Sequence, residues 1–184
     1  MKIFRFVFFF SICLALFYFL NYSYQDNPAV GPLLSPHHGF LQNAEKDSIN
    51  LPSTIFSDKL SGNVSVSFDE ILIPHIQSEK HTDAYFAFGY ITAHHRLWQM
   101  DFYSRLVFGR LSEVLGERAL DFDRLNRRIG LPMMTRDFHE RVQKDEVLKS
   151  ILQAYTDGVN AYIAQLAPRD YPIEFKLLNY KPEK

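Results

Sequence analysis

Histidines are the first side chains in this sequence that suggest chemistry. His75, His81, His94 and His95 lie close together along the chain. A zinc site needs three or four nitrogen, oxygen or sulfur ligands that converge on one point. The sequence has no H-E-x-x-H spacing, and neighbours on a helix, such as His94 and His95, point about 100° apart. We therefore predict no metal site in this chain.

A second candidate combines His94 with Asp101 and Arg105, which fall on one row of a regular helix. Asp101 and Arg105 stand in the i,i+4 relation that lets a carboxylate meet a guanidinium. The surrounding sequence is strongly apolar, and this favours a buried structural cluster over a catalytic one. We take His94, Asp101 and Arg105 as structural candidates.

A recognisable nucleophile motif is absent from the sequence. There is no G-x-S-x-G turn, and the nearest approach to it, residues 109–113, lacks the final glycine. The only cysteine, Cys13, lies in an apolar N-terminal segment, so thiol chemistry is excluded for the rest of the chain. The prediction is that this chain holds no catalytic residue, and its substrate-binding residues are unknown.

The element that must position these side chains is a long helix predicted over residues 83–108. From residue 84 to residue 108 the only formal charges are Arg96, Asp101 and Arg105, so a surface helix with one wet face is a poor description. Other parts of the structure must cover it on several sides. Gly109 is a plausible end, because glycine enters the left-handed conformation without strain.

Shorter elements flank this helix on both sides. Alternation over residues 64–68 predicts a strand, paired with a second short strand over residues 75–78. A helix is predicted over residues 119–129, with its charges on a solvated or subunit-facing side. Another is predicted from residue 145 to residue 166, with Asp145 and Glu146 in its first turn, where the helix dipole favours anions. The chain is therefore α+β and mostly helical, with one hairpin.

The N-terminus carries Lys2 and Arg5 and then no charge until Asp26. Residues 1–25 therefore read as a signal-anchor or transmembrane helix that meets the membrane through residues 6–24, with a cleaved signal as the alternative. The positive-inside tendency leaves the N-terminus in the cytoplasm and exports the bulk of the chain. Residues 26–61 form a proline-containing extended linker, and residues 62–184 form the domain. A net charge of −1 with interspersed signs gives no reason to expect a nucleic-acid partner.

Several short blocks in one order carry a resemblance to a known family. They are PHI at residues 74–76, DAYFAFGY followed by RLWQM, GRLSEVLG, AYTDGVNAYI, and the tail EFKLLNYKPE. Together they resemble the opening of the penicillin acylase (penicillin amidase) family of N-terminal-nucleophile hydrolases. The resemblance implies the N-terminal, mostly helical part of an αββα domain, which is incomplete here. Leu72 stands where members carry glycine, and this departure argues against a tight left-handed turn.

The same resemblance implies how the protein would work. Family members are made as one precursor that cuts itself, and the second chain begins with the catalytic serine, which is expected beyond Lys184. The implied partner is that second-chain polypeptide. The family often binds a structural calcium through residues absent here, so no cofactor is expected in this chain. The implied activity is hydrolysis of linear amides in penicillins, N-acyl-homoserine lactones or similar compounds, and the chain would not be active alone. The alternative is a membrane-anchored helical interaction module without catalysis.

Overall fold

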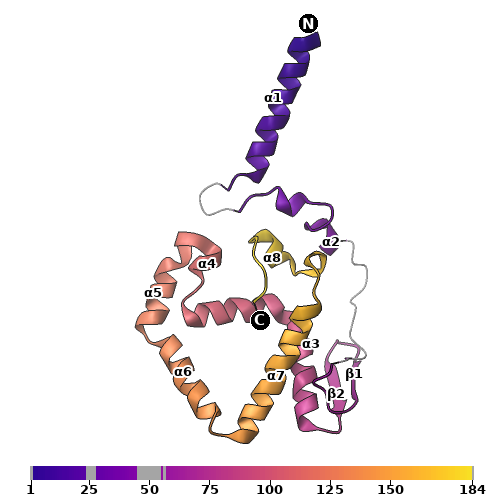
Figure 1. The fold of residues 1–184 in the computed structure, drawn as a ribbon, viewed down its shortest axis with the longest axis vertical. Coiled ribbons are helices and arrows are strands. Elements are labelled where there is room, and N and C mark those ends of the chain that lie inside the picture. Colours follow the sequence, from indigo (N-terminus) through magenta and orange to yellow (C-terminus); the bar gives the residue numbers. More distant parts are fainter. Residues whose placement is uncertain (1, 24–27, 45–54, 56, 184) are drawn as a thin grey trace.

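The computed structural model describes residues 2–23, 28–44, 55 and 57–183 of the 184-residue chain. Its fold is α+β and mostly helical, as predicted, with a two-stranded antiparallel sheet (Figure 1). The described elements, in chain order, are α1 (Lys2–Asn21), η1 (Pro32–Leu34), α2 (Leu41–Ala44), β1 (Val64–Phe68), β2 (Pro74–Ser78), α3 (His81–Phe108), α4 (Ser112–Leu115), η2 (Gly116–Ala119), α5 (Leu120–Arg128), α6 (Leu131–Val142), α7 (Glu146–Gln165), η3 (Pro168–Asp170) and α8 (Ile173–Leu177).

The hairpin of β1 and β2 follows the predicted alternation. Val64 and Val66 are buried against α3, while Ser65 and Ser67 between them are exposed. The predicted turn was wrong in one respect, because Leu72 does adopt a left-handed backbone, with φ 64°. The side chain of Asp69 holds this turn, since its Oδ1 accepts hydrogen bonds from the amides of Ile71 at 3.1 Å and Ile73 at 2.8 Å.

The long helix α3 is bent, which the sequence did not predict. Arg96 has φ −137° and ψ 22°, outside the helical range, so the helix runs in two directions on either side of it (Figure 1). The predicted end is confirmed: α3 stops at Phe108, and Gly109 caps it with φ 62° and ψ 48°. Because of the bend, the rotation of 100° per residue does not hold across Arg96. Residues before and after Arg96 therefore cannot be assigned to one face of the helix from their spacing alone.

The first half of α3 packs closely against α7, and we call this contact the α3–α7 junction. Gly89 and Gly158 lie at the crossing. A Cβ on Gly89 would sit 2.0 Å from the carbonyl oxygen of Tyr155, and one on Gly158 would sit 1.9 Å from that of Phe86. The two backbones therefore touch, and no larger residue fits at either position.

The buried side chains form two clusters along α3. The first joins Phe86, Ala87 and Ile91 of α3 to the buried face of β1. The second joins Ala93 and Leu97 to Phe175 of α8, whose side chain is fully buried. Since Phe175 lies 78 positions after Leu97, part of the cover of α3 comes from residues much further along the chain.

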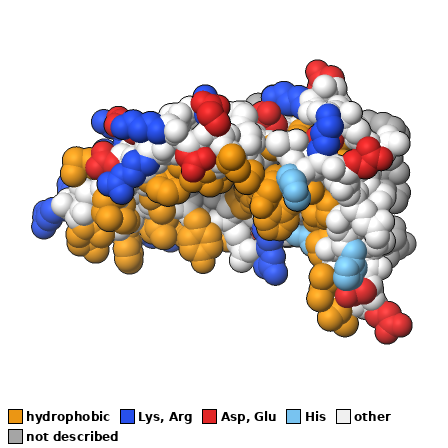
Figure 2. Space-filling model, turned by 90° about the horizontal axis from the view of Figure 1, so that it is seen from below, with side chains coloured by type: hydrophobic (Ala, Val, Ile, Leu, Met, Phe, Trp, Pro, Cys, Tyr) orange, Lys and Arg blue, Asp and Glu red, His pale blue; other side chains and the backbone are white. Residues whose placement is uncertain are grey.

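Helices α5 and α6 form an arm that carries its apolar side chains outward. The exposed set on this α5–α6 arm is Phe122, Leu125, Ile129, Met133, Met134 and Phe138. Figure 2 shows hydrophobic side chains gathered along this side of the molecule. The prediction of a solvated charged face on α5 fails at Asp123, which is 3% exposed and turned inward. The sequence also gave no indication of α6, which begins after Gly130 and contains Pro132 in its first turn.

Residues 28–44 do not form an open spacer, although they lie within the predicted extended linker. Asn43 donates from Nδ2 to the carbonyl oxygen of Tyr171 at 3.1 Å. Lys176 donates from Nζ to the carbonyl oxygen of Gly39 at 3.2 Å and to the side-chain oxygen of Asn43. This segment is therefore bonded to the region around η3 and α8. The boundaries proposed at residues 25 and 61 remain predictions.

Candidate functional site

Arg105, on the second half of α3, is the centre of a buried ion-pair network. Its Nε lies 2.9 Å from Oδ2 of Asp101, and both side chains are nearly inaccessible to solvent, at 6% and 8% exposure. Its Nη1 lies 2.9 Å from Oε2 of Glu113, and its Nη2 lies 2.9 Å from Oε1 of Glu183. One guanidinium thus joins α3, α4 and the C-terminal tail. Burial alone would lower the pKa of Arg105, but the hydrogen bonds to Asp101 and Glu183 raise it above its ordinary value.

The aromatic ring of Tyr180 closes one side of this network. The guanidinium carbon of Arg105 lies 5.1 Å from the ring centroid, within the range of a cation–π contact. Burial of Tyr180, together with a hydrogen bond to Asp101, raises the pKa of its hydroxyl. The hydroxyl therefore stays protonated and serves as a donor to the carboxylate.

Arg110 extends the network to the surface. It forms a bidentate pair with Glu113, at 2.8 and 2.7 Å, and a second with Glu183, at 3.2 Å for each contact. Hydrogen bonds from Arg110 are the main cause that lowers the pKa of both carboxyls. Two arginines and three carboxylates thus fix the tail to α3 and α4 through planar, bidentate geometry.

Asp123, on α5, fixes the turn between α3 and α4 through a second set of hydrogen bonds. Its carboxylate accepts hydrogen bonds from the amides of Leu111 and Ser112, each at 2.8 Å, and from the hydroxyl of Ser112 at 2.5 Å. Burial would raise the pKa of Asp123, but these hydrogen bonds hold it below its ordinary value. The carboxylate anchors the turn between α3 and α4, where the backbone amides have no helical acceptor.

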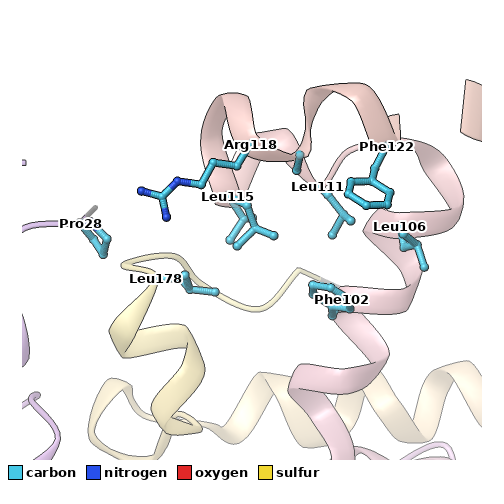
Figure 3. Close-up of a pocket in the computed structure, with 10 residues that line it drawn as sticks. Pro28, Phe102, Leu106, Leu111, Leu115, Arg118, Phe122 and Leu178 are labelled. Atoms are coloured by element: carbon cyan, nitrogen blue, oxygen red, sulfur yellow. The ribbon is translucent and has the colours of Figure 1, made fainter. Parts of the chain in front are cut away.

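An apolar cavity of about 460 Å³ lies beside this turn. Figure 3 shows Phe102 and Leu106 of α3 facing Leu111, Leu115 and Phe122, with Pro28 and Arg118 toward one opening. Among the described residues that line the cavity, Arg118 alone carries a charge. The cavity suits an apolar group, and its walls contain no arrangement for bond cleavage.

His94 lies among aromatic rings. Its ring contacts Tyr162 of α7, with ring centroids 5.5 Å apart, and the neighbouring His95, at 5.2 Å. Asp101 and Arg105 are brought together as the spacing predicted. The grouping of His94 with them assumed a regular helix through Arg96, where the backbone departs from helical geometry, and it stays a prediction. In the part of the chain that the structure describes, no group of three or more His, Cys, Asp or Glu side chains is arranged to hold a metal ion.

The sequence reasoning missed four members of the network, Arg110, Glu113, Tyr180 and Glu183. A signal for them was present, since Arg110 and Glu113 lie in the block GRLSEVLG and the other two lie in the block NYKPE. Both blocks were recognised as family features without a structural reason. The network supplies that reason, because it joins these two blocks in space.

The fold and its comparisons define the class of this protein. The structure matches a thermostable penicillin G acylase from Alcaligenes faecalis with a TM-score of 0.58 and 31% identity. The match covers 66% of this chain and 64% of the solved chain. The described fold is therefore part of an α+β N-terminal-nucleophile hydrolase domain.

Sequence comparison gives the family. Residues 63–184 match the penicillin amidase family, and the chain belongs to that family. It is 41% identical over 124 residues to the penicillin acylase 2 proenzyme of Pseudomonas sp. (strain SE83), covering 67% of this chain and 16% of the relative. It is 37% identical over 124 residues to the acyl-homoserine lactone acylase QuiP of Pseudomonas syringae pv. syringae (strain B728a), covering 67% of this chain and 15% of the relative. The chain thus spans about one sixth of the length of these curated relatives.

Proposed function

We propose that this chain is the N-terminal part of an acylase that hydrolyses linear amide bonds, with its nucleophilic serine on a second polypeptide of the same precursor. The observation that carries the proposal is the uncovered apolar face of the α5–α6 arm in a chain of the penicillin amidase family. Six large apolar side chains on two neighbouring helices are exposed there. A face of that kind marks a surface that another polypeptide covers.

This chain covers very different fractions of a solved acylase chain and of a full-length proenzyme. That difference supports a separate second polypeptide. The chain covers 64% of the solved acylase chain but only 16% of the curated proenzyme. This fourfold difference is expected if the mature acylases contain a short chain that corresponds to this one. The related names indicate amide substrates with an acyl group, either penicillins or N-acyl-homoserine lactones.

The chemistry of this class explains why the chain itself would hold no catalytic residue. A serine hydroxyl is inert alone, and in N-terminal-nucleophile hydrolases its own α-amino group serves as the base, since that amine titrates near neutral pH. The contribution of this chain is positional. Arg105 and Arg110 hold the tail at Glu183 against α3, and that tail leads toward the rest of the precursor.

We further propose that α1 anchors the protein in a membrane with its bulk exported. The helix is 20 residues long and strongly apolar, it carries no charge after Arg5, and none of its described side chains is buried. Lys2 and Arg5 at its start favour a cytoplasmic N-terminus. Calcium, if the complete enzyme binds it, would be held by residues outside this chain.

Co-purification from the source organism tests the proposal. We expect a tagged chain to bring down a polypeptide of the same precursor whose first residue is serine, and amide hydrolysis to require both. Mass spectrometry of the second polypeptide's N-terminus and an acylase assay measure these outcomes. Hydrolysis by the chain alone would contradict a nucleophile on a second polypeptide. A stable monomer with a sharp thermal transition and no such companion would favour the non-catalytic membrane-anchored module.

A further inference from the structure

The segment of residues 28–44 returns to the end of α1 instead of leading away from it. The amide of Gly31 donates to the carbonyl oxygen of Leu20 at 2.7 Å. The approach is close, since a Cβ on Gly31 would lie 2.9 Å from Oδ1 of Asn21 and 3.1 Å from the same Leu20 oxygen. Gly31 is therefore fixed at the level of the last turn of α1.

The length of α1 places that level at the edge of a bilayer. Its 20 residues extend about 30 Å, close to the thickness of the hydrocarbon core, about 30 Å, with the long side chains of Lys2 and Arg5 in the first turns reaching back to the cytoplasmic headgroups. Leu20 and Asn21 then lie where the core meets the headgroups. Tyr18 and Tyr22 stack there with ring centroids 5.2 Å apart, and tyrosine is enriched at this depth in membrane proteins. The headgroup layer is only about 5–8 Å thick, so a residue bonded to Leu20 lies within or next to it.

The composition of the returning segment suits that location. From residue 6 to residue 44 the sequence contains one formally charged residue, Asp26. Within residues 28–44, Val30 and Leu34 are each 48% exposed and Leu41 is 43% exposed. Apolar side chains without neighbouring charges bury favourably at the boundary between headgroups and acyl chains.

The segment is also bound to the body of the molecule. Asn43 bonds to Tyr171, and Lys176 bonds to Gly39 and Asn43. In addition, η1 contacts α8. The body therefore cannot move away from the end of α1 without breaking these contacts, and in Figure 1 it lies directly below that end.

We propose that residues 28–44 form a collar that rests on the lipid surface and seats the exported domain against the membrane. The lipid interface covers the exposed side chains of Val30 and Leu34. This inference rests on the anchor in the proposed function. The domain would then hold a fixed orientation, with the turn between α6 and α7 pointing away from the bilayer.

Depth-dependent fluorescence quenching tests the collar in the full chain inserted into phosphatidylcholine–phosphatidylglycerol vesicles. Cys13→Ser removes the only cysteine, and an environment-sensitive dye is attached at one new cysteine in each of three variants. Phe17→Cys reports insertion of α1, Leu34→Cys reports the collar, and Lys144→Cys, in the turn between α6 and α7, is the distant control. Nitroxide-labelled lipids are the quencher. We expect at least twofold stronger quenching at position 34 than at position 144.

Each outcome separates the collar from the anchor. Strong quenching at position 17 with equal, weak quenching at positions 34 and 144 would overturn the collar and leave the anchor. An unquenched position 17 would overturn the anchor and the collar together. Protection of position 34 from aqueous iodide without quenching by lipid nitroxides would show that protein covers it, which also overturns the collar. Gly31→Val should abolish lipid quenching at position 34 while position 17 keeps it, because the side chain prevents the return to Leu20.

Discussion

The α3–α7 junction and the α5–α6 arm both carry large apolar side chains on helices, and these side chains end in opposite surroundings. In the junction, apolar residues such as Phe86 and Ile91 are buried, and two glycines bring the helix backbones into contact. In the arm, Phe122 and Phe138 are 60% and 58% exposed, while the carboxylate of Asp123 is buried. The difference teaches that helical periodicity identifies a face that needs cover, but does not say which polypeptide supplies the cover.

The largest effect is expected where the junction is tightest. Gly158→Val places carbon atoms where the carbonyl oxygen of Phe86 already lies, so α3 and α7 must separate. We expect a loss of at least about 4 kcal/mol in the free energy of unfolding. Chemical denaturation of the protein isolated with the proposed second polypeptide measures this loss. Gly62→Ala is the control, because a Cβ there meets only Asp83 at 3.7 Å, and it should cost less than about 1 kcal/mol.

The buried ion pair on the second half of α3 and the exposed ion pair on the arm should differ in energy. Arg105→Ala leaves the buried carboxylate of Asp101 without its partner and should cost about 3–5 kcal/mol. Arg124→Ala removes a comparable pair with Asp121 on the arm, where both side chains are exposed, and should cost less than about 1 kcal/mol. Equal midpoints for the two variants in denaturant titrations would show that the Arg105 network contributes no more than a surface pair.

Acid should weaken the packed side of the molecule through Glu113 and Glu183. The pKa values of both lie below the ordinary 4.5, chiefly because of Arg110. The unfolded chain binds more protons at these sites, so their contribution to stability is present above pH 4.5 and is lost as the pH falls through the lower folded values. Glu183→Gln should therefore be destabilising at neutral pH, with a deficit that shrinks below pH 4.5. Thermal melts at several pH values measure this deficit. A deficit that stays constant with pH would contradict the linkage.

The hairpin beside the junction offers a stabilising change. Leu72 holds a left-handed backbone, which costs a residue with a side chain about 1–2 kcal/mol, whereas glycine adopts it freely. Leu72→Gly should raise the free energy of unfolding by up to about 1 kcal/mol after the greater entropy of glycine in the unfolded chain is counted. Ile71→Gly, at the neighbouring position without a positive φ, should lower it. A thermal melt of each variant provides the comparison.

The arm should show the smallest effect on stability. Phe138→Ser removes a side chain that already lies largely in water, so the chain should lose less than about 0.5 kcal/mol. Leu97→Ala, at a position 4% exposed, should cost about 2–5 kcal/mol. Phe138→Ser should instead reduce binding of a hydrophobic dye by the chain alone and weaken its capture of the partner polypeptide. Unchanged capture by this variant would place the partner's contact elsewhere.

Features governed by local chemistry were predictable from the sequence. Asp145 accepts hydrogen bonds from the amides of Val147 and Leu148, each at 3.0 Å, and caps α7 where the prediction began that helix. Gly109 ends α3 for an equally local reason, its left-handed backbone. The pairing of Asp101 with Arg105 also needed only one turn of helix.

Features that depend on distant residues were not predictable. The bend at Arg96 lies in a segment without proline or glycine, so no local signal marks it. Asp123 reads as a surface charge until the amides of Leu111 and Ser112 are placed beside it. Glu183 likewise has no local reason to be fixed, because its partners are two arginines far earlier in the chain.

The tie between Arg110 and Glu183 has a consequence for the timing of folding. The two residues are 73 positions apart, so Arg110 can pair with Glu183 only after all the residues between them have been made. At a synthesis rate of about 5–20 residues per second, this interval lasts about 4–15 seconds. During that time the second half of α3 has neither Phe175 nor the tail to cover it, and the newly made chain would be a client for chaperones that bind exposed apolar segments.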